Sequence, residues 1–115
     1  PVPGTKAWML GIANVRGNLV TVVHLRGFLE GEPFRVTERT RVLVVRQASG
    51  ATGLVVDEVL GQRSFVDEQL RGMDVYADSP VSRFIENEYR VGQSVWGVFS
   101  MTELMRAPDF MQASA

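Results

Sequence analysis

The sequence predicts an all-β protein built mostly from short antiparallel strands. Glycine occurs 11 times in 115 residues and divides the chain into short segments rich in valine. Runs of β-branched residues between turn-forming residues are typical of strands. Helix signals are few, because most apolar runs are too short to show a helical period. These observations together favour a small β-protein over a mixed or helical one.

Four apolar runs have the length and composition of strands. Alternation between apolar and polar residues is weak within them, which favours burial on both faces, as in a closed barrel or a sandwich. The expected strands are residues 19–25, 41–46, 54–60 and 94–99.

Signals for turns and for a helix cap predict the structure of the remaining segments. Gly17-Asn18 lies between two strand-like runs and predicts a hairpin, and residues 49–53 predict a second one. A short turn within residues 4–10 is expected before the first strand. Ser100 caps a helix over residues 102–106, with Glu103 completing a capping box and Pro108 ending the helix. Residues 31–40 and 71–83 are expected to be loops, and the tail after Pro108 is expected to fray.

Composition narrows the classes of function. The length fits one domain, and no apolar run approaches the roughly 18 residues that span a bilayer. The chain has no cysteine and a single histidine, His24, which excludes thiolate metal sites, cysteine nucleophiles and paired-histidine sites. A net charge of -1 argues against nucleic acid as an electrostatic partner. His24 is interpreted as an ordinary strand histidine.

Charge differs between the two halves of the chain. Residues 1–50 hold seven basic and three acidic side chains, whereas residues 51–115 hold five and ten. Eleven of the 12 basic residues are arginine, which favours planar, bidentate recognition. The asymmetry fits either an incidental difference between two lobes or a protein that docks different partners on each half.

Acidic residues do not form a convincing catalytic pair. Asp57 and Glu58 are adjacent, so on a strand they point to opposite faces. Glu86, Glu88 and Arg90 follow a strand period and are interpreted as one solvated face. We therefore expect no enzyme activity, no cofactor and no metal.

The segment 11–17 (GIANVRG) stands out. Asn and Gly around Arg16 allow a tight turn with positive φ, from which the guanidinium extends five donors. An arginine held in such a turn is either salt-bridged for structure, which the residues alone favour, or presented to a partner.

Three segments together resemble a known family. Residues 11–29 (GIANVRGNLVTVVHLRGFL) resemble the signature of CheW-like domains, G-x-x-N-x-R-G followed by Pro-Val-x-Asp-Leu-Arg. Residues 42–45 (VLVV) and 53–61 (GLVVDEVLG) are similar to its second signature, and 96–104 (WGVFSMTEL) to its closing strand and helix. Within the family, the lead-in and the ending most resemble adaptors of twitching-motility, type IV pilus chemosensory systems.

The chain departs from the family pattern in three places. Thr21 stands where the family has Pro, and His24 stands where it has Asp. The second change removes a carboxylate that would pair with Arg16 or Arg26. Family members also begin with two strands that have no counterpart here, so we expect a single CheW-like domain over residues 1–115, truncated at its N-terminus. Open strand edges would then favour self-association or strand exchange.

The resemblance implies a fold and a function. The implied fold is a pair of small five-stranded, SH3-like β-barrels, the first lacking its N-terminal strands, with a short C-terminal helix. The implied function is a non-catalytic adaptor that couples the cytoplasmic tip of a chemoreceptor to the regulatory domain of a CheA-type histidine kinase. It would be cytoplasmic, recruited to receptor arrays at the inner membrane, without inserting into the membrane or binding nucleic acid.

The resemblance also assigns residues to partners. The receptor-binding positions are Asn14, Arg16, Gly17 and Arg26, and the kinase-binding positions are Val56, Asp57 and Val59. Two alternatives stay open at this point. The chain would be either the CheW-like regulatory domain of a kinase or a small β-barrel that binds a ligand or single-stranded nucleic acid.

Overall fold

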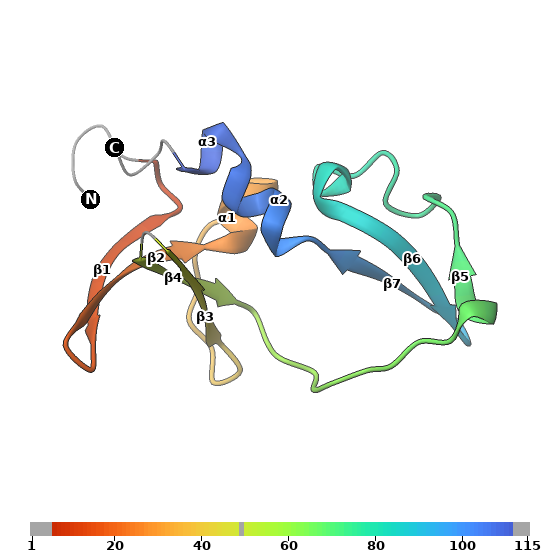
Figure 1. Cartoon of the computed structure of the whole chain (residues 1–115), viewed down its shortest axis with the longest axis horizontal. Coiled ribbons are helices and arrows are strands. Elements are labelled where there is room, and N and C mark those ends of the chain that lie inside the picture. Colours follow the sequence, from red (N-terminus) through yellow and green to blue (C-terminus); the bar gives the residue numbers. More distant parts are fainter. Residues whose placement is uncertain (1–5, 49, 112–115) are drawn as a thin grey trace. The chain divides into compact units, whose positions relative to one another are not determined.

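A computed structural model describes residues 6–48 and 50–111, which fold into two compact units. The first comprises the chain up to Leu60, and the second comprises Gly61–Met111. Figure 1 shows one β-sheet in each unit and only short helices, so the predicted all-β class is confirmed. The five-stranded barrels are not confirmed, because the described residues form a four-stranded and a three-stranded sheet.

The first unit is a four-stranded sheet in the order β1-β2-β4-β3. The β1–β2 and β3–β4 pairs are antiparallel, and the central β2–β4 pair is parallel. The outer strands β1 and β3 are the edges of the sheet, and the expected self-association through such edges stays a prediction. The elements are β1 (Met9–Val15), β2 (Asn18–His24), α1 (Leu25–Glu30), β3 (Arg41–Gln47) and β4 (Gly50–Val56).

Both predicted hairpins exist, but the first turns one residue earlier than the predicted Gly17-Asn18, because Asn18 already pairs with Val15. In the first, Arg16 and Gly17 turn the chain between β1 and β2 with φ of 53° and 84°. The Asn14 side chain accepts a 2.9 Å hydrogen bond from the Gly17 backbone N–H and closes the turn. This explains the sequence pattern, because Asn stabilises the turn and Gly adopts positive φ without steric cost.

The second hairpin turns earlier than predicted. Gln47 pairs with Gly50, so residues 51–53 lie within β4 and not in the turn. Ser49, the first residue of the predicted turn, lies outside the described residues. The short turn before the first strand is confirmed where the chain is described, by a hydrogen bond from the Met9 N–H to the Lys6 carbonyl.

Two strand predictions need correction at their C-terminal ends. The run 54–60 was expected to be a strand, but β4 ends at Val56 because its partner β3 begins opposite it at Arg41. The run 19–25 was expected to continue through residue 25, but β2 ends at His24 and α1 follows. Sequence gave little sign of α1, since His24 provides no side-chain cap and Gly27 lies inside the helix.

Apolar residues of the central strands form the core of the first unit. Val20, Val23, Leu54 and Val55 are buried. Trp8 and Phe28 meet edge to face with ring centroids 4.9 Å apart. These contacts fix α1 beside the end of β2, where the candidate site lies.

The second unit is a three-stranded antiparallel sheet in the order β5-β6-β7. One face carries the cross-strand row Leu70, Tyr89 and Trp96, with Phe65 stacked on Tyr89 at 4.7 Å. The elements are η1 (Asp67–Gln69), β5 (Leu70–Arg71), η2 (Ser82–Phe84), β6 (Ile85–Val91), β7 (Ser94–Phe99), α2 (Met101–Arg106) and α3 (Pro108–Met111).

The C-terminal helix prediction is confirmed except for the capping box, because the Ser100 N–H donates to the Phe84 carbonyl and not to the Glu103 side chain. The prediction that the tail after Pro108 frays is wrong for residues 109–111. The Ser100 side chain accepts a 3.1 Å hydrogen bond from the Glu103 N–H and caps α2. Beyond it, α3 buries Phe110, and Asp109 pairs with both terminal nitrogens of Arg83. The hydrogen bond from Arg83 lowers the pKa of Asp109. Tertiary contacts therefore order a segment that lacks a local pattern.

The interpretation of Glu88 as part of a solvated face is wrong. Glu88 lies opposite Gly97 on β7, and its side chain is buried. The segment 74–76 crosses this face and donates three backbone N–H groups to the carboxylate, at 3.0, 3.0 and 2.8 Å. Burial raises the pKa of Glu88, but these three hydrogen bonds outweigh burial and the net shift is downward.

Candidate functional site

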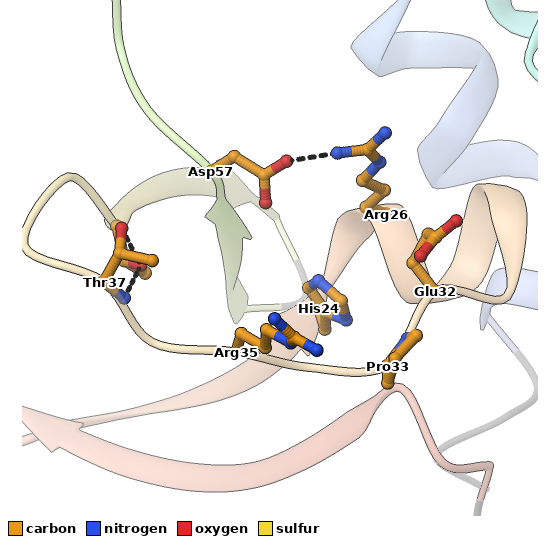
Figure 2. Close-up of a pocket in the computed structure, with 8 residues that line it drawn as sticks. His24, Arg26, Glu32, Pro33, Arg35, Thr37 and Asp57 are labelled. Carbon is orange, nitrogen blue, oxygen red and sulfur yellow. Dashed lines mark hydrogen bonds and ion pairs between the residues drawn. The ribbon is translucent and has the colours of Figure 1, made fainter.

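A pocket of about 310 Å³ lies in the first unit where β2 passes into α1. Figure 2 shows His24 at its centre, below Arg26 and Asp57, with the loop after α1 closing the near side. The residues that line it are His24, Arg26, Glu32, Pro33, Arg35, Thr37, Thr40 and Asp57.

Arg26 and Asp57 form an ion pair across the pocket. The Arg26 Nη1 lies 2.7 Å from the Asp57 Oδ2, and the Arg26 Nε lies 2.7 Å from the Glu30 Oε2. The hydrogen bonds to Glu30 and Asp57, helped by the two negative charges, raise the pKa of Arg26. Arg26 is thus paired with two carboxylates, although position 24 carries His where the family pattern has Asp. The pair also ties the start of α1 to the end of β4.

His24 is enclosed by its neighbours on two sides. Its side chain is 4% exposed, and its ring meets Phe34 edge to face with centroids 5.2 Å apart. A Cβ at Gly27 would lie 2.7 Å from the His24 Nδ1, so any other residue there must displace the His24 ring or α1. His24 is therefore a strand residue, as predicted, and also part of the pocket wall.

The predicted receptor-binding turn lies at the other end of β2. Asn18 begins the strand and His24 ends it, so six steps of extended chain place the turn about 20 Å from the pocket. Among the described residues, the Arg16 side chain has no hydrogen-bond or ion-pair partner. Of the two roles left open for Arg16, the structure contradicts the salt bridge.

The structure joins some predicted site residues and separates others. Arg26, predicted to contact the receptor, and Asp57, predicted to contact the kinase, are ion-paired in one pocket. Asn14, Arg16 and Gly17 form the distant turn. Val56 is half-buried at the end of β4, and Val59 is exposed beyond it; neither lines the pocket.

Sequence reasoning missed the contribution of the loop after α1. Arg35, Thr37 and Thr40 line the pocket, although residues 31–40 were interpreted only as a polar loop. The Thr37 N–H donates to the Thr40 hydroxyl at 2.8 Å, and the Arg39 N–H donates to the Thr37 hydroxyl at 3.1 Å. The two threonines three residues apart were the available signal, because hydroxyls at this spacing stabilise a local turn.

The chain matches a known protein family along most of its length. The match is to the CheW-like domain and covers residues 1–109. The chain belongs to the CheW-like domain family. The resemblance noted from residues 11–29 and 53–61 is thereby confirmed.

Named relatives of this CheW-like domain include a chemotaxis protein. The domain is 34% identical over 113 residues to Protein PilI of Pseudomonas aeruginosa, covering 98% of this chain and 63% of PilI. It is 24% identical over 94 residues to the chemotaxis protein CheW of Bacillus subtilis, covering 78% and 60%. It is 36% identical over 63 residues to Protein FrzA of Myxococcus xanthus, covering 55% and 39%.

A solved structure shares the fold of this CheW-like domain. The scaffolding protein TtCheW from Thermoanaerobacter tengcongensis superposes with a TM-score of 0.69 at 18% identity, covering 87% of this chain and 64% of TtCheW. The chain therefore spans somewhat less than two thirds of the length of PilI and of TtCheW.

The described residues contain neither a metal-binding cluster nor a membrane-spanning helix. No cluster of three or more His, Cys, Asp or Glu side chains there is arranged to hold a metal ion. Within the same residues, no helix is both long and apolar enough to cross a membrane.

Proposed function

We propose that this chain is a non-catalytic adaptor that couples chemoreceptors to a CheA-type histidine kinase in a system controlling type IV pilus twitching motility. Its family membership supports an adaptor, and its similarity to PilI supports the twitching system. In this proposal the protein acts in the cytoplasm and is recruited to receptor arrays. Its partners are the cytoplasmic tip of a receptor and the kinase regulatory domain.

The state of Arg16 is the observation that carries the receptor half of the proposal. An L-residue at φ 53° is held there at a steric cost of about 1–2 kcal/mol, which the surrounding turn must offset. The side chain that this conformation displays is exposed and makes no hydrogen bond or ion pair with another described residue. An ordered turn that displays an unpaired arginine is well suited to binding a partner, because its backbone loses little entropy on docking and the guanidinium gives up no ion pair.

Apolar side chains next to this turn would contribute to the same interface. Asn14 pairs with Leu19 and Ile12 with Thr21, so Leu19 and Ile12 share one face of the hairpin with Asn14. Ile12 is 69% exposed and Leu19 is 70% exposed. We assign this face, together with Arg16 and Gly17, to the receptor. Exposed aliphatic residues beside an arginine fit the composition of the centre of a protein interface.

The kinase half of the proposal rests on the segment that follows β4. Val56 ends the strand, Val59 is 53% exposed, and Asp57 is held by Arg26. We assign Val56, Asp57 and Val59 to kinase contact, and Arg26 to the receptor side. The ion pair between Arg26 and Asp57 would then connect the two binding regions mechanically.

The test compares the affinity of the wild type and of Arg16→Ala for a fragment of the receptor tip. We expect an unchanged circular dichroism spectrum and an affinity at least about tenfold weaker, the usual effect of removing an interface arginine that dominates binding. Arg46→Ala is the matched control, because Arg46 is exposed and lies on β3, at the opposite edge of the same sheet. Its affinity should equal that of the wild type.

Other outcomes would contradict the proposal. If Arg16→Ala captures the receptor fragment normally, Arg16 is not a receptor-binding residue. If this variant unfolds, Arg16 stabilises the fold instead of contacting a partner. Failure of the wild type to bind both the receptor tip and the kinase regulatory domain would reject the adaptor. Saturable, salt-dependent binding of mixed oligonucleotides would favour a nucleic-acid module instead. A kinase catalytic domain encoded upstream in the same reading frame would make the chain a kinase regulatory domain.

A further inference from the structure

The pocket of the first unit contains two nitrogen-bearing side chains that no described residue satisfies. His24 is 96% buried, and its ring accepts and donates no hydrogen bond within this part of the chain. Every fully enclosed side-chain nitrogen or oxygen of the described residues has a hydrogen-bond partner. The ring nitrogens of His24 therefore each keep some accessible surface, and the ring lines the pocket. A polar group buried to this degree is usually hydrogen-bonded, so the ring is available to a hydrogen-bonding group that enters the pocket.

Arg35 is the second unsatisfied group. It lines the same pocket as His24 (Figure 2). No hydrogen bond or ion pair joins its side chain to another described residue. Arg26 differs, because its guanidinium is paired with Glu30 and Asp57. Of the two arginines that line the pocket, one is therefore neutralised and the other has no ion-pair partner among the described residues, and the latter shares the pocket with the buried imidazole.

We propose that this pocket binds a carboxylate, that of an Asp or Glu side chain presented by a protein partner. The two oxygens of a carboxylate match the parallel N–H groups of the Arg35 guanidinium, and a ring N–H of His24 can donate to the same anion. The protein source of the carboxylate rests on the adaptor function proposed above. The anion site itself rests only on the geometry of the pocket.

The charge balance of the walls favours a singly charged anion. Asp57 and Glu32 also line the pocket. Asp57 is paired with Arg26, and Figure 2 shows Glu32 on the Arg26 side, away from Arg35. A single negative charge neutralises Arg35, whereas a second negative charge would have no cation left to pair with beside Glu32 and Asp57. The charge of the walls therefore suits a carboxylate.

The pocket is also placed to receive a side chain from outside. The loop over residues 31–39 supplies part of the pocket wall, and all of its residues are exposed. Its volume of about 310 Å³ is at the small end of ligand sites and accommodates a short acidic side chain. A partner that docks over this loop can insert Asp or Glu without displacing a strand.

The test uses His24 as a reporter, since it is the sole histidine of the chain and its ring proton resonances are unambiguous in NMR. The probes are the blocked peptide Ac-Ala-Glu-Ala-NH2, its uncharged counterpart Ac-Ala-Gln-Ala-NH2, and propionate, which is the end of a Glu side chain as a free acid. The variants are Arg35→Gln and the control Arg39→Gln, which alters an exposed arginine of the same loop that does not line the pocket. Ionic strength is held constant with chloride.

We expect the Glu peptide and propionate to shift the His24 signals saturably, and the Gln peptide to leave them unchanged. Arg35→Gln should weaken both responses at least tenfold, while Arg39→Gln should leave them at the wild-type level. Equal responses to the Gln peptide, or an unaltered response in Arg35→Gln, would overturn the site. A response to propionate without one to the Glu peptide would assign the pocket to a free small acid and overturn the side-chain source. None of these measurements involves a receptor or kinase, so they fail or succeed independently of the adaptor proposal.

Discussion

Replacing Gly27 by Ala tests the packing that holds His24 in the pocket wall. A Cβ at this position would lie 2.7 Å from the His24 Nδ1 and 2.9 Å from the Trp8 Cβ. Ordinary van der Waals contacts begin near 3.4 Å, so both neighbours must move by about half an ångström or more. Inserting a methyl group into a packed site in this way costs about 1–3 kcal/mol.

The substitution also has a favourable component. Gly27 lies inside α1, where Ala is preferred over Gly by about 0.5–1 kcal/mol. Because two contacts fall below 3.0 Å and one of them involves the Cβ of Trp8, which moves only with its backbone, we take the upper half of the packing cost. The net destabilisation is then about 1–2.5 kcal/mol, a factor of about 5–70 in the folding equilibrium.

The assay is urea unfolding followed by tryptophan fluorescence, with the His24 ring resonances recorded in the folded state. Gly72→Ala is the control, because a Cβ at Gly72 meets nothing within 4 Å and its φ is not in the left-handed region. It should change stability by no more than a few tenths of a kcal/mol, or raise it slightly. Gly27→Ala at or above wild-type stability, with unshifted His24 resonances, would refute the close packing of α1 on His24.

Two further predictions concern the second unit. Glu88→Gln should lower the urea midpoint at neutral pH, because an amide replaces the carboxylate that accepts three backbone N–H groups. The pKa of Glu88 is lowered in the folded state, so its ionised form stabilises the fold above its usual value of 4.5 and loses this effect as pH falls below it. The wild type should therefore lose stability as the pH falls below this value. An equal loss in Glu88→Gln would contradict the role of the Glu88 carboxylate in this pH dependence. Ser100→Ala should cost about 1 kcal/mol by removing the cap of α2, measured by thermal unfolding. Ser94→Ala is the comparison, because Ser94 is exposed and its hydroxyl makes no hydrogen bond with the described residues, so its unfolding temperature should equal that of the wild type.

Features fixed by neighbouring residues were predictable from the chain itself. The turn at Arg16 and Gly17 follows from Asn14 three residues before Gly17, because its side chain reaches the Gly17 N–H and glycine permits positive φ. The cap at Ser100 follows from the same kind of short-range hydrogen bond. The family signature is also local, so sequence alone identified the CheW-like domain and its all-β class. The residues alone favoured a salt bridge for Arg16, and only the structure showed that its side chain is exposed without an ion-pair partner among the described residues.

Features that depend on distant contacts were decided only by the tertiary structure. Glu88 has the spacing of a solvated strand residue, yet it is buried because a segment 12–14 residues away in sequence supplies its three donors. Asp57 lies 31 residues from Arg26, and no local pattern pairs them. The pocket around His24 arises in the same way, from the parallel pairing of β2 with β4 and the return of the loop after α1. Sequence thus singled out Arg16, Arg26 and Asp57 as candidate site residues but not Arg35. Only the fold determined which side chains meet, because strand pairing brings together residues whose separation along the chain carries no periodic signal.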